Sequence, residues 1–154
     1  MPGAGFYSIH TARLTFGSDG RWYADDAPVV HPRLARLFSR YLRRKADGGY
    51  EIWIDERYHA DVTVDDTPYV VTTVEPEADG QFTLDLSDGT NELLDPDSLR
   101  VSADNVLYCR VKNGREPARF LRSAYYQLAQ FIEDAGNGRF QLRCAGVAHV
   151  IQPR

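Results

Sequence analysis

The sequence contains the same local pattern twice, about ninety residues apart. Each copy predicts an amphipathic helix, because apolar residues recur three or four positions apart, followed by a glycine turn and an alternating strand. An aromatic strand precedes each copy, at residues 20–24 and 106–111. The repeat predicts two structurally similar halves, each a helix packed on a small, mainly antiparallel sheet. The aligned residues are Phe38 with Leu128, Tyr41 with Phe131, Leu42 with Ile132, Gly48 with Gly138, Tyr50 with Phe140, and Ile52 with Leu142.

Proline and glycine mark the ends of the first predicted helix. Pro32 suits a first helical position, because its missing N–H would have no partner there in any case. The Asp-Gly-Gly sequence at 47–49 predicts the end of the helix. Residues 43–45, which are all basic, then fall in the last turn, where cations favour the negative end of the helix dipole.

The segment between the two copies alternates with a period of two. It predicts short strands at 58–64, 69–74 and 82–86, separated by turns rich in aspartate, glycine and proline. Because these strands follow one another directly instead of alternating with helices, the predicted fold class is α+β. We expect an N-terminal repeat at 1–66 and a C-terminal repeat at 67–154, packed as one compact unit.

Composition limits the classes of protein to which this chain can belong. It has 154 residues and a formal charge of −4, and this mild acidity disfavours a sequence-independent nucleic-acid binder. No apolar run is long enough for a membrane span, and the first twenty residues lack a signal-peptide pattern. Cys109 and Cys144 are too few for a disulfide framework and predict two buried thiols. We therefore expect a cytoplasmic protein, either a monomer or a homodimer.

A series of motifs covers the chain from Leu14 onward. In the first half these are Gly-Arg-Trp at 20–22, Pro-Val-Val-His-Pro-Arg-Leu-Ala-Arg-Leu-Phe at 28–38, Asp-Gly-Gly-Tyr at 47–50 and Val-Asp-Asp-Thr-Pro-Tyr-Val at 64–70; looser matches follow at 98–101, 118–128 and 140–142. Their order resembles the bacterial family called domain of unknown function 1285 (DUF1285).

The resemblance to DUF1285 carries expectations for both fold and function. It implies two similar α+β halves, the second somewhat like a pleckstrin-homology scaffold, with no established enzymatic activity and a regulatory or signalling role. The chain departs from the pattern at His31, where an arginine is expected, and at 54–58, where a Thr-Pro-containing segment is expected.

Histidine and carboxylate residues give weaker indications of chemistry. The four histidines, at positions 10, 31, 59 and 149, match no metal-binding spacing, so we expect neither a metal nor another cofactor. His59 and Asp61 lie two positions apart on one predicted strand and so share a face, where a base and an orienting carboxylate could act. The alternative function is therefore a small enzyme that uses this pair on the central sheet, although a solvated strand face produces the same pattern.

Arginine provides the strongest functional signal. Of the 18 basic residues, 16 are arginine. Four of them recur three or four positions apart on the first predicted helix and form one stripe, which could clamp phosphate or carboxylate groups. We therefore predict a non-enzymatic binding module that recognises an unidentified protein or a small anionic ligand. The stripe consists of Arg33, Arg36, Arg40 and Arg44.

Trp53 is a further candidate for the binding site. The alternation of residues 50–54 places Trp53 on the polar face of its strand, beside Glu51. A tryptophan on such a face is either covered by the second half or offered to a partner. If Trp53 is offered to a partner, that partner could be a second copy of the chain, and the protein would then be a structural homodimer formed through Trp53. Trp22, in contrast, is predicted to lie in the core.

Overall fold

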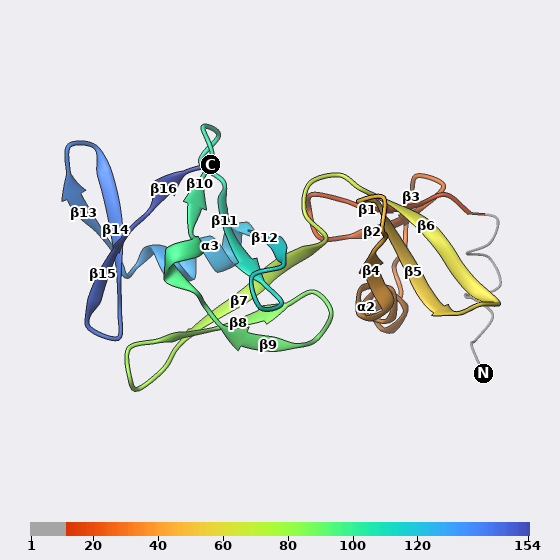
Figure 1. Ribbon diagram of the computed structural model, residues 1–154, viewed down its shortest axis with the longest axis horizontal. Helices are drawn as coiled ribbons and strands as arrows, with labels where there is room; N and C mark the ends of the chain where they lie inside the picture. Colours follow the sequence, from red (N-terminus) through yellow and green to blue (C-terminus); the bar gives the residue numbers. More distant parts are fainter. Residues whose placement is uncertain (1–11) are drawn as a thin grey trace. The chain divides into compact units, whose positions relative to one another are not determined.

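The computed structural model describes residues 12–154 and divides the chain into two compact units, Met1–Pro68 (unit 1) and Tyr69–Arg154 (unit 2) (Figure 1). The described residues form three β-sheets and two α-helices, so the predicted α+β class is confirmed. The packing of the two halves as one compact unit stays a prediction. His10 lies outside the described residues.

Unit 1 contains a six-stranded sheet with a helix packed against β5. The strand order is β3-β2-β1-β6-β5-β4, and neighbouring strands are antiparallel except for β1 and β6, which are parallel. The parallel pairing of β1 with β6 connects the two ends of the unit within one sheet. The elements are β1 (Leu14–Phe16), β2 (Trp22–Ala24), β3 (Ala27–Pro28), α2 (Pro32–Tyr41), β4 (Leu42–Arg44), β5 (Tyr50–Asp55) and β6 (Tyr58–Val64).

Helix α2 begins where the sequence predicts but ends earlier. His31 caps it, because its Nδ1 accepts a hydrogen bond from the N–H of Leu34 at 3.4 Å. The prediction that the helix continues through residues 43–45 is wrong, because β4 starts at Leu42 and pairs with β5. Gly48, with a φ of +90°, belongs to the turn between these strands and does not end a helix. Pairing with β5 therefore outweighs the local preference for helix.

An aromatic cluster forms the core of unit 1. Trp22 is only 1% exposed, and its ring centroid lies 5.1 Å from that of Phe16 and 5.4 Å from that of Phe38. Its indole Nε1 donates a hydrogen bond to Oγ of Ser39 at 2.8 Å, so the polar atom of this buried ring is satisfied. The cluster holds α2 against β1 and β2, and the prediction that Trp22 lies in the core is confirmed.

Unit 2 contains a seven-stranded sheet and a three-stranded sheet. The strand orders are β16-β10-β11-β12-β7-β8-β9 and β13-β14-β15. The elements are β7 (Tyr69–Pro76), β8 (Phe82–Leu86), β9 (Asn91–Leu93), η2 (Pro96–Ser98), β10 (Arg100–Val101), β11 (Leu107–Val111), β12 (Glu116–Phe120), α3 (Arg122–Ala129), β13 (Ile132–Gly136), β14 (Arg139–Cys144), β15 (Val147–Val150) and β16 (Gln152–Pro153).

Helix α3 packs against β7 and helps to close the core of unit 2. Gln127 on this helix fixes the contact, because its Oε1 accepts a hydrogen bond from the N–H of Val74 at 2.7 Å. Cys109 and Cys144 are free and buried, as the sequence predicts, and burial raises the pKa of the Cys109 thiol. Within residues 12–154, no helix combines the length and apolar character that crossing a membrane requires.

Corresponding strand pairs occur in the two units. Leu42 faces Ile52 in unit 1 and Ile132 faces Leu142 in unit 2, so both partners are offset by ninety residues. A parallel strand pair also occurs in each unit. The first strand of the hairpin β1–β2 pairs in parallel with β6, and the first strand of the hairpin β10–β11 pairs in parallel with β16. Unit 2 in addition contains β7, β8 and β9, which continue its sheet beyond β12.

Gly80 marks a close approach between two turns of unit 2. Its φ is +86°, and its carbonyl oxygen accepts a hydrogen bond from the N–H of Ala145 at 3.0 Å. A Cβ at Gly80 would lie only 3.2 Å from the backbone nitrogen of Ala145. The position therefore requires glycine for two reasons, the backbone conformation and the space.

We expect Gly80→Ala to lower the free energy of unfolding by about 1–2 kcal/mol from the backbone conformation alone, and further through the contact with Ala145. Urea unfolding measures this loss. The matched control is Gly114→Ala, because Gly114 also has a positive φ but nothing lies within 4 Å of its Cβ position. Equal losses in the two variants would contradict a contribution from the close approach.

Candidate functional site

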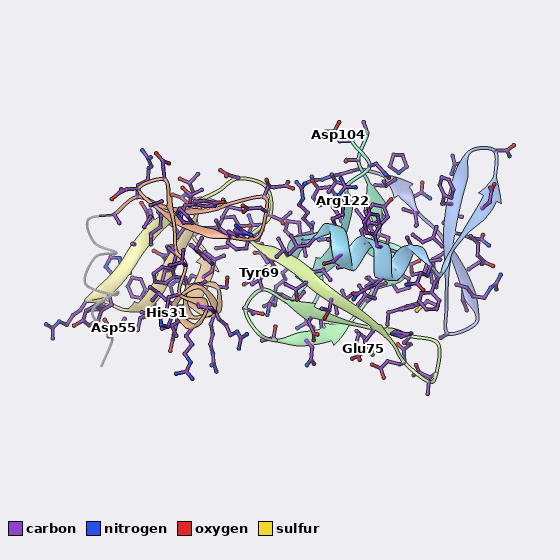
Figure 2. All side chains as sticks on the ribbon, turned by 180° about the vertical axis from the view of Figure 1, so that it is seen from behind. His31, Asp55, Tyr69, Glu75, Asp104 and Arg122 are labelled. Atoms are coloured by element: carbon purple, nitrogen blue, oxygen red, sulfur yellow. The ribbon has the colours of Figure 1, made fainter. Side chains whose placement is uncertain are left out.

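Three arginines of α2, which we call the α2 arginines, are exposed: Arg33, Arg36 and Arg40. In Figure 2, nitrogen-tipped side chains extend outward from the helix that follows His31. Among residues 12–154, none of the α2 arginines has an ion-pair partner. Three other cations of unit 1 are paired: Arg13 with Asp26, Arg43 with Glu51, and Lys45 with Asp61.

The α2 arginines lie close to one another on the helix. Arg36 stands three positions after Arg33 and four before Arg40, so the three side chains are neighbours and repel each other. The first turn has no acidic residue to balance Arg33, which lies near the positive end of the helix dipole. The arrangement costs the helix some stability and leaves three guanidinium groups available to anions.

Arg44, the fourth member of the predicted stripe, does not lie on the helix. It belongs to β4, where it faces Tyr50 on β5. Its guanidinium carbon lies 4.9 Å from the centroid of the Tyr50 ring, and its Nη2 donates a hydrogen bond to the Tyr50 hydroxyl. The predicted four-residue stripe is therefore corrected to the three α2 arginines, because the helix ends at Tyr41.

Trp53 lies on β5, the strand that pairs with β4, and is half-buried. It faces His59 across the strands, with the two rings stacked at a centroid distance of 4.7 Å and an interplanar angle of 27°. The guanidinium of Arg43 lies 4.3 Å from the Trp53 ring centroid. These neighbours within unit 1 cover much of the ring, while its predicted contact with the second half or with a partner stays a prediction.

His59 and Asp61 share one face of β6, as the alternation predicts, and line a pocket of about 350 Å³ together with Arg13. Asp61 accepts a hydrogen bond from Nζ of Lys45 at 2.9 Å, and His59 stacks on Trp53. The carboxylate is thus engaged by an ammonium group. The role of His59 and Asp61 as an acid/base pair stays a prediction.

The remaining described histidines have structural contacts. His31 caps α2, and Nδ1 of His149 lies 2.6 Å from Oδ1 of Asp97. Within the described part of the chain, no group of three or more histidine, cysteine or acidic side chains is arranged to hold a metal ion.

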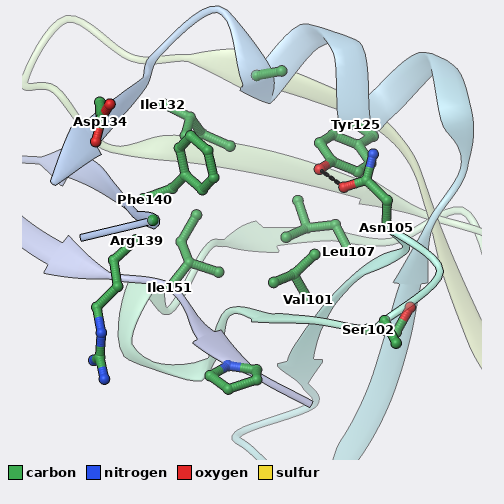
Figure 3. A pocket seen from close by; sticks show the side chains of 14 residues that line it. Val101, Ser102, Asn105, Leu107, Tyr125, Ile132, Asp134, Arg139, Phe140 and Ile151 are labelled. Atoms are coloured by element: carbon green, nitrogen blue, oxygen red, sulfur yellow. Dashed lines mark hydrogen bonds between the residues drawn. The ribbon is translucent and has the colours of Figure 1, made fainter. Parts of the chain in front are cut away.

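Unit 2 contains a pocket of about 730 Å³ that the sequence reasoning missed. Figure 3 shows apolar side chains converging on its centre, with a hydrogen bond at one end from the Tyr125 hydroxyl to Oδ1 of Asn105, at 2.7 Å. Asp134 and Arg139 lie at the other end. Partial burial raises the pKa of Tyr125. The apolar walls include Val101, Leu107, Ala129, Ile132, Phe140 and Ile151.

The sequence carries no local signal for this pocket, because its walls come from segments spread over residues 101–153. Each lining residue taken alone has an ordinary place on a strand, a helix or a turn.

Two solved structures share this fold. A crystal structure of a DUF1285 family protein from Silicibacter pomeroyi DSS-3 matches with a TM-score of 0.70 and 21% identity, covering 99% of this chain and 89% of that chain. A DUF1285 family protein from Shewanella baltica OS155 matches with a TM-score of 0.61 and 20% identity, covering 78% of this chain and 92% of that chain. No family model and no curated protein matches the sequence. The chain therefore has the fold of DUF1285 family proteins, and the resemblance seen in its motifs is confirmed at the level of the fold.

Proposed function

We propose that this protein is a non-enzymatic binding module with a regulatory or signalling role, and that it recognises an acidic protein segment through the α2 arginines. The observation that carries the proposal is the exposure of three neighbouring guanidinium groups that have no ion-pair partner among the described residues. Uncompensated like charges cost stability, and such a cost is typical of surfaces kept for binding.

The geometry of α2 favours an extended partner over a small ligand. Side chains three or four positions apart on a helix are separated by about 5–6 Å at Cβ, so the three groups form a row and not a cage. The α2 arginines line neither of the two pockets described above. A row of planar donor forks matches successive carboxylates on an acidic peptide.

The proposal includes the internal organisation of the chain. We infer that the two units are copies of one α+β unit, the second extended by β7–β9 and similar to a pleckstrin-homology scaffold. The support for two copies is the recurrence of strand pairs, such as Leu42 with Ile52 and Ile132 with Leu142. The support for the scaffold is a seven-stranded sheet with one helix packed on it.

The proposed binding is tested by fluorescence anisotropy with a labelled oligo-glutamate peptide, at low and at physiological ionic strength. Reversing two charges, Arg36→Glu with Arg40→Glu, should weaken the affinity about tenfold or more. The matched control is Arg21→Glu with Arg57→Glu, which changes the net charge equally at exposed positions outside α2. An equal loss of affinity in both variants would show a general charge effect and contradict a site on α2.

The same surface predicts a gain in stability on charge reversal. Arg36→Glu removes two repulsive pairs and creates attractive ones with Arg33 and Arg40, so it should raise the free energy of unfolding by about 0.5–1.5 kcal/mol. Thermal unfolding at low ionic strength measures the gain, which added salt should reduce. A loss of stability would mean that Arg36 makes favourable contacts within the folded chain.

A further inference from the structure

The pocket in unit 2 lies where unit 1 is filled by aromatic rings. In unit 1, β1 and β2 place Phe16 opposite Trp22. In unit 2, the strands with the same pairings, β10 and β11, place Val101 opposite Leu107. The parallel neighbours also correspond, because Phe16 pairs with Val64 on β6 and Val101 pairs with Pro153 on β16.

The helices α2 and α3 also carry corresponding residues next to this space. Ser39 on α2 receives the hydrogen bond of the Trp22 indole, and the residue ninety positions later is Ala129 on α3. Val101, Leu107 and Ala129 all line the unit 2 pocket. The second unit thus has an aliphatic residue at each of the two ring positions and a methyl group where the hydroxyl partner stands.

In unit 1 the corresponding space is closed. Phe16 and Trp22 are 0% and 1% exposed, and their rings pack 5.1 Å apart. Unit 2 keeps a pocket of about 730 Å³ there, within the range of about 300–1,000 Å³ that is usual for small-molecule sites. A protein core normally closes around smaller side chains, so a pocket that stays open among them has the features of a binding site.

We propose that this pocket binds a small aromatic compound of one or two rings that carries a hydrogen-bond acceptor. The aromatic body follows from the comparison of the units, because the ligand would occupy the space that an indole and a phenyl ring fill in unit 1. The apolar side chains at the centre of Figure 3 provide contacts for such rings, and Phe140 can contact a ring directly.

The acceptor follows from the polar groups at the ends of the pocket. Asn105 uses its Oδ1 to accept from Tyr125, and its NH₂ group has no hydrogen-bond partner among residues 12–154. At the opposite end, the Arg139 guanidinium likewise has no partner within the described residues. Either donor can bind a carboxylate or carbonyl oxygen on the ligand, and Asp134 beside Arg139 limits the total charge that this end attracts.

The test uses indole and indole-3-acetate as probes, titrated into the full chain with labelled methyl groups. The proposal expects saturable NMR shifts of the methyl groups of Val101, Leu107, Ile132 and Ile151, with tighter binding of the acetate. It further expects Val101→Phe with Leu107→Trp, which installs the residues of unit 1, to weaken binding at least about tenfold. Absence of saturable shifts with both probes would overturn the proposal.

Two controls make the outcome specific. Val147→Phe adds a ring at an exposed position of unit 2 and should leave probe binding unchanged. If circular dichroism shows that the double variant is unfolded, Leu107→Phe alone replaces it, and undiminished probe binding in the folded variant overturns the proposal. The double variant should still bind the oligo-glutamate peptide, so failure of the pocket and failure of the α2 site are distinguishable.

Discussion

Replacing Trp22 with alanine should lower the free energy of unfolding by about 3–5 kcal/mol, the range for removal of a large buried aromatic side chain. Trp22 is 1% exposed and contacts two further rings, those of Phe16 and Phe38. Its loss leaves a cavity between α2 and the sheet. It also leaves the Ser39 hydroxyl, which is buried, without its indole partner.

Urea unfolding of the full chain, monitored by circular dichroism, measures this effect. The matched control is Trp53→Ala, because Trp53 is the same residue type on the same sheet but is only half-buried. The control should lose clearly less stability than Trp22→Ala. A loss in the control equal to or larger than that for Trp22 would contradict the assignment of the aromatic cluster as the core of unit 1.

The second large effect concerns the ion pair between Lys112 and Asp88 in unit 2. Their side chains are 23% and 6% exposed, and Lys112 Nζ donates to Asp88 Oδ2 at 2.6 Å and to Thr90 Oγ1 at 3.0 Å. Lys112→Met should cost about 3 kcal/mol, because it leaves a buried carboxylate without its cation. Methionine keeps the unbranched side chain that the positive φ of this position already accommodates.

A double-mutant cycle with Asp88→Asn separates the pair from its surroundings. The double variant should be more stable than the sum of the two single losses implies, because neither charge is then buried alone. Strictly additive losses would contradict a direct interaction. Denaturant unfolding of all four proteins at neutral pH provides the measurement.

The pair also predicts a dependence on pH. Burial alone would raise the pKa of Asp88, but hydrogen bonds from Lys112 and Thr90 outweigh it and hold the pKa below the usual value of 3.8. The stabilisation is therefore present above about pH 4 and is lost as the pH falls through the lowered pKa of the folded state. The difference in stability between the natural protein and Lys112→Met should shrink over that range.

The sequence predicts the fold well where local periodicity and burial agree. The start of α2 at Pro32 and the strand at 58–64 are where the pattern places them. The end of α2 is not, because residues 42–44 fit a helical pattern by themselves and become a strand only through pairing with 50–52. Such pairing depends on a partner outside the window that periodicity can read.

The candidate sites differ in the same way. The α2 arginines could be found from spacing on one helix, and Arg44 was misplaced only because the helix ends early. The unit 2 pocket could not be found, since Val101, Ala129 and Phe140 meet only in the folded chain. Its basis, smaller side chains at the positions of Phe16 and Trp22, becomes visible only after strand pairing aligns the two units.

The central claim, that an acidic protein segment binds α2, is tested most directly by locating the peptide on the protein. The measurement is an NMR titration of the arginine Nε–Hε resonances with the oligo-glutamate peptide. We expect the largest shifts at the α2 arginines, with Arg21 and Arg57 nearly unchanged. Shifts spread evenly over the exposed arginines, or concentrated outside α2, would contradict the proposed function.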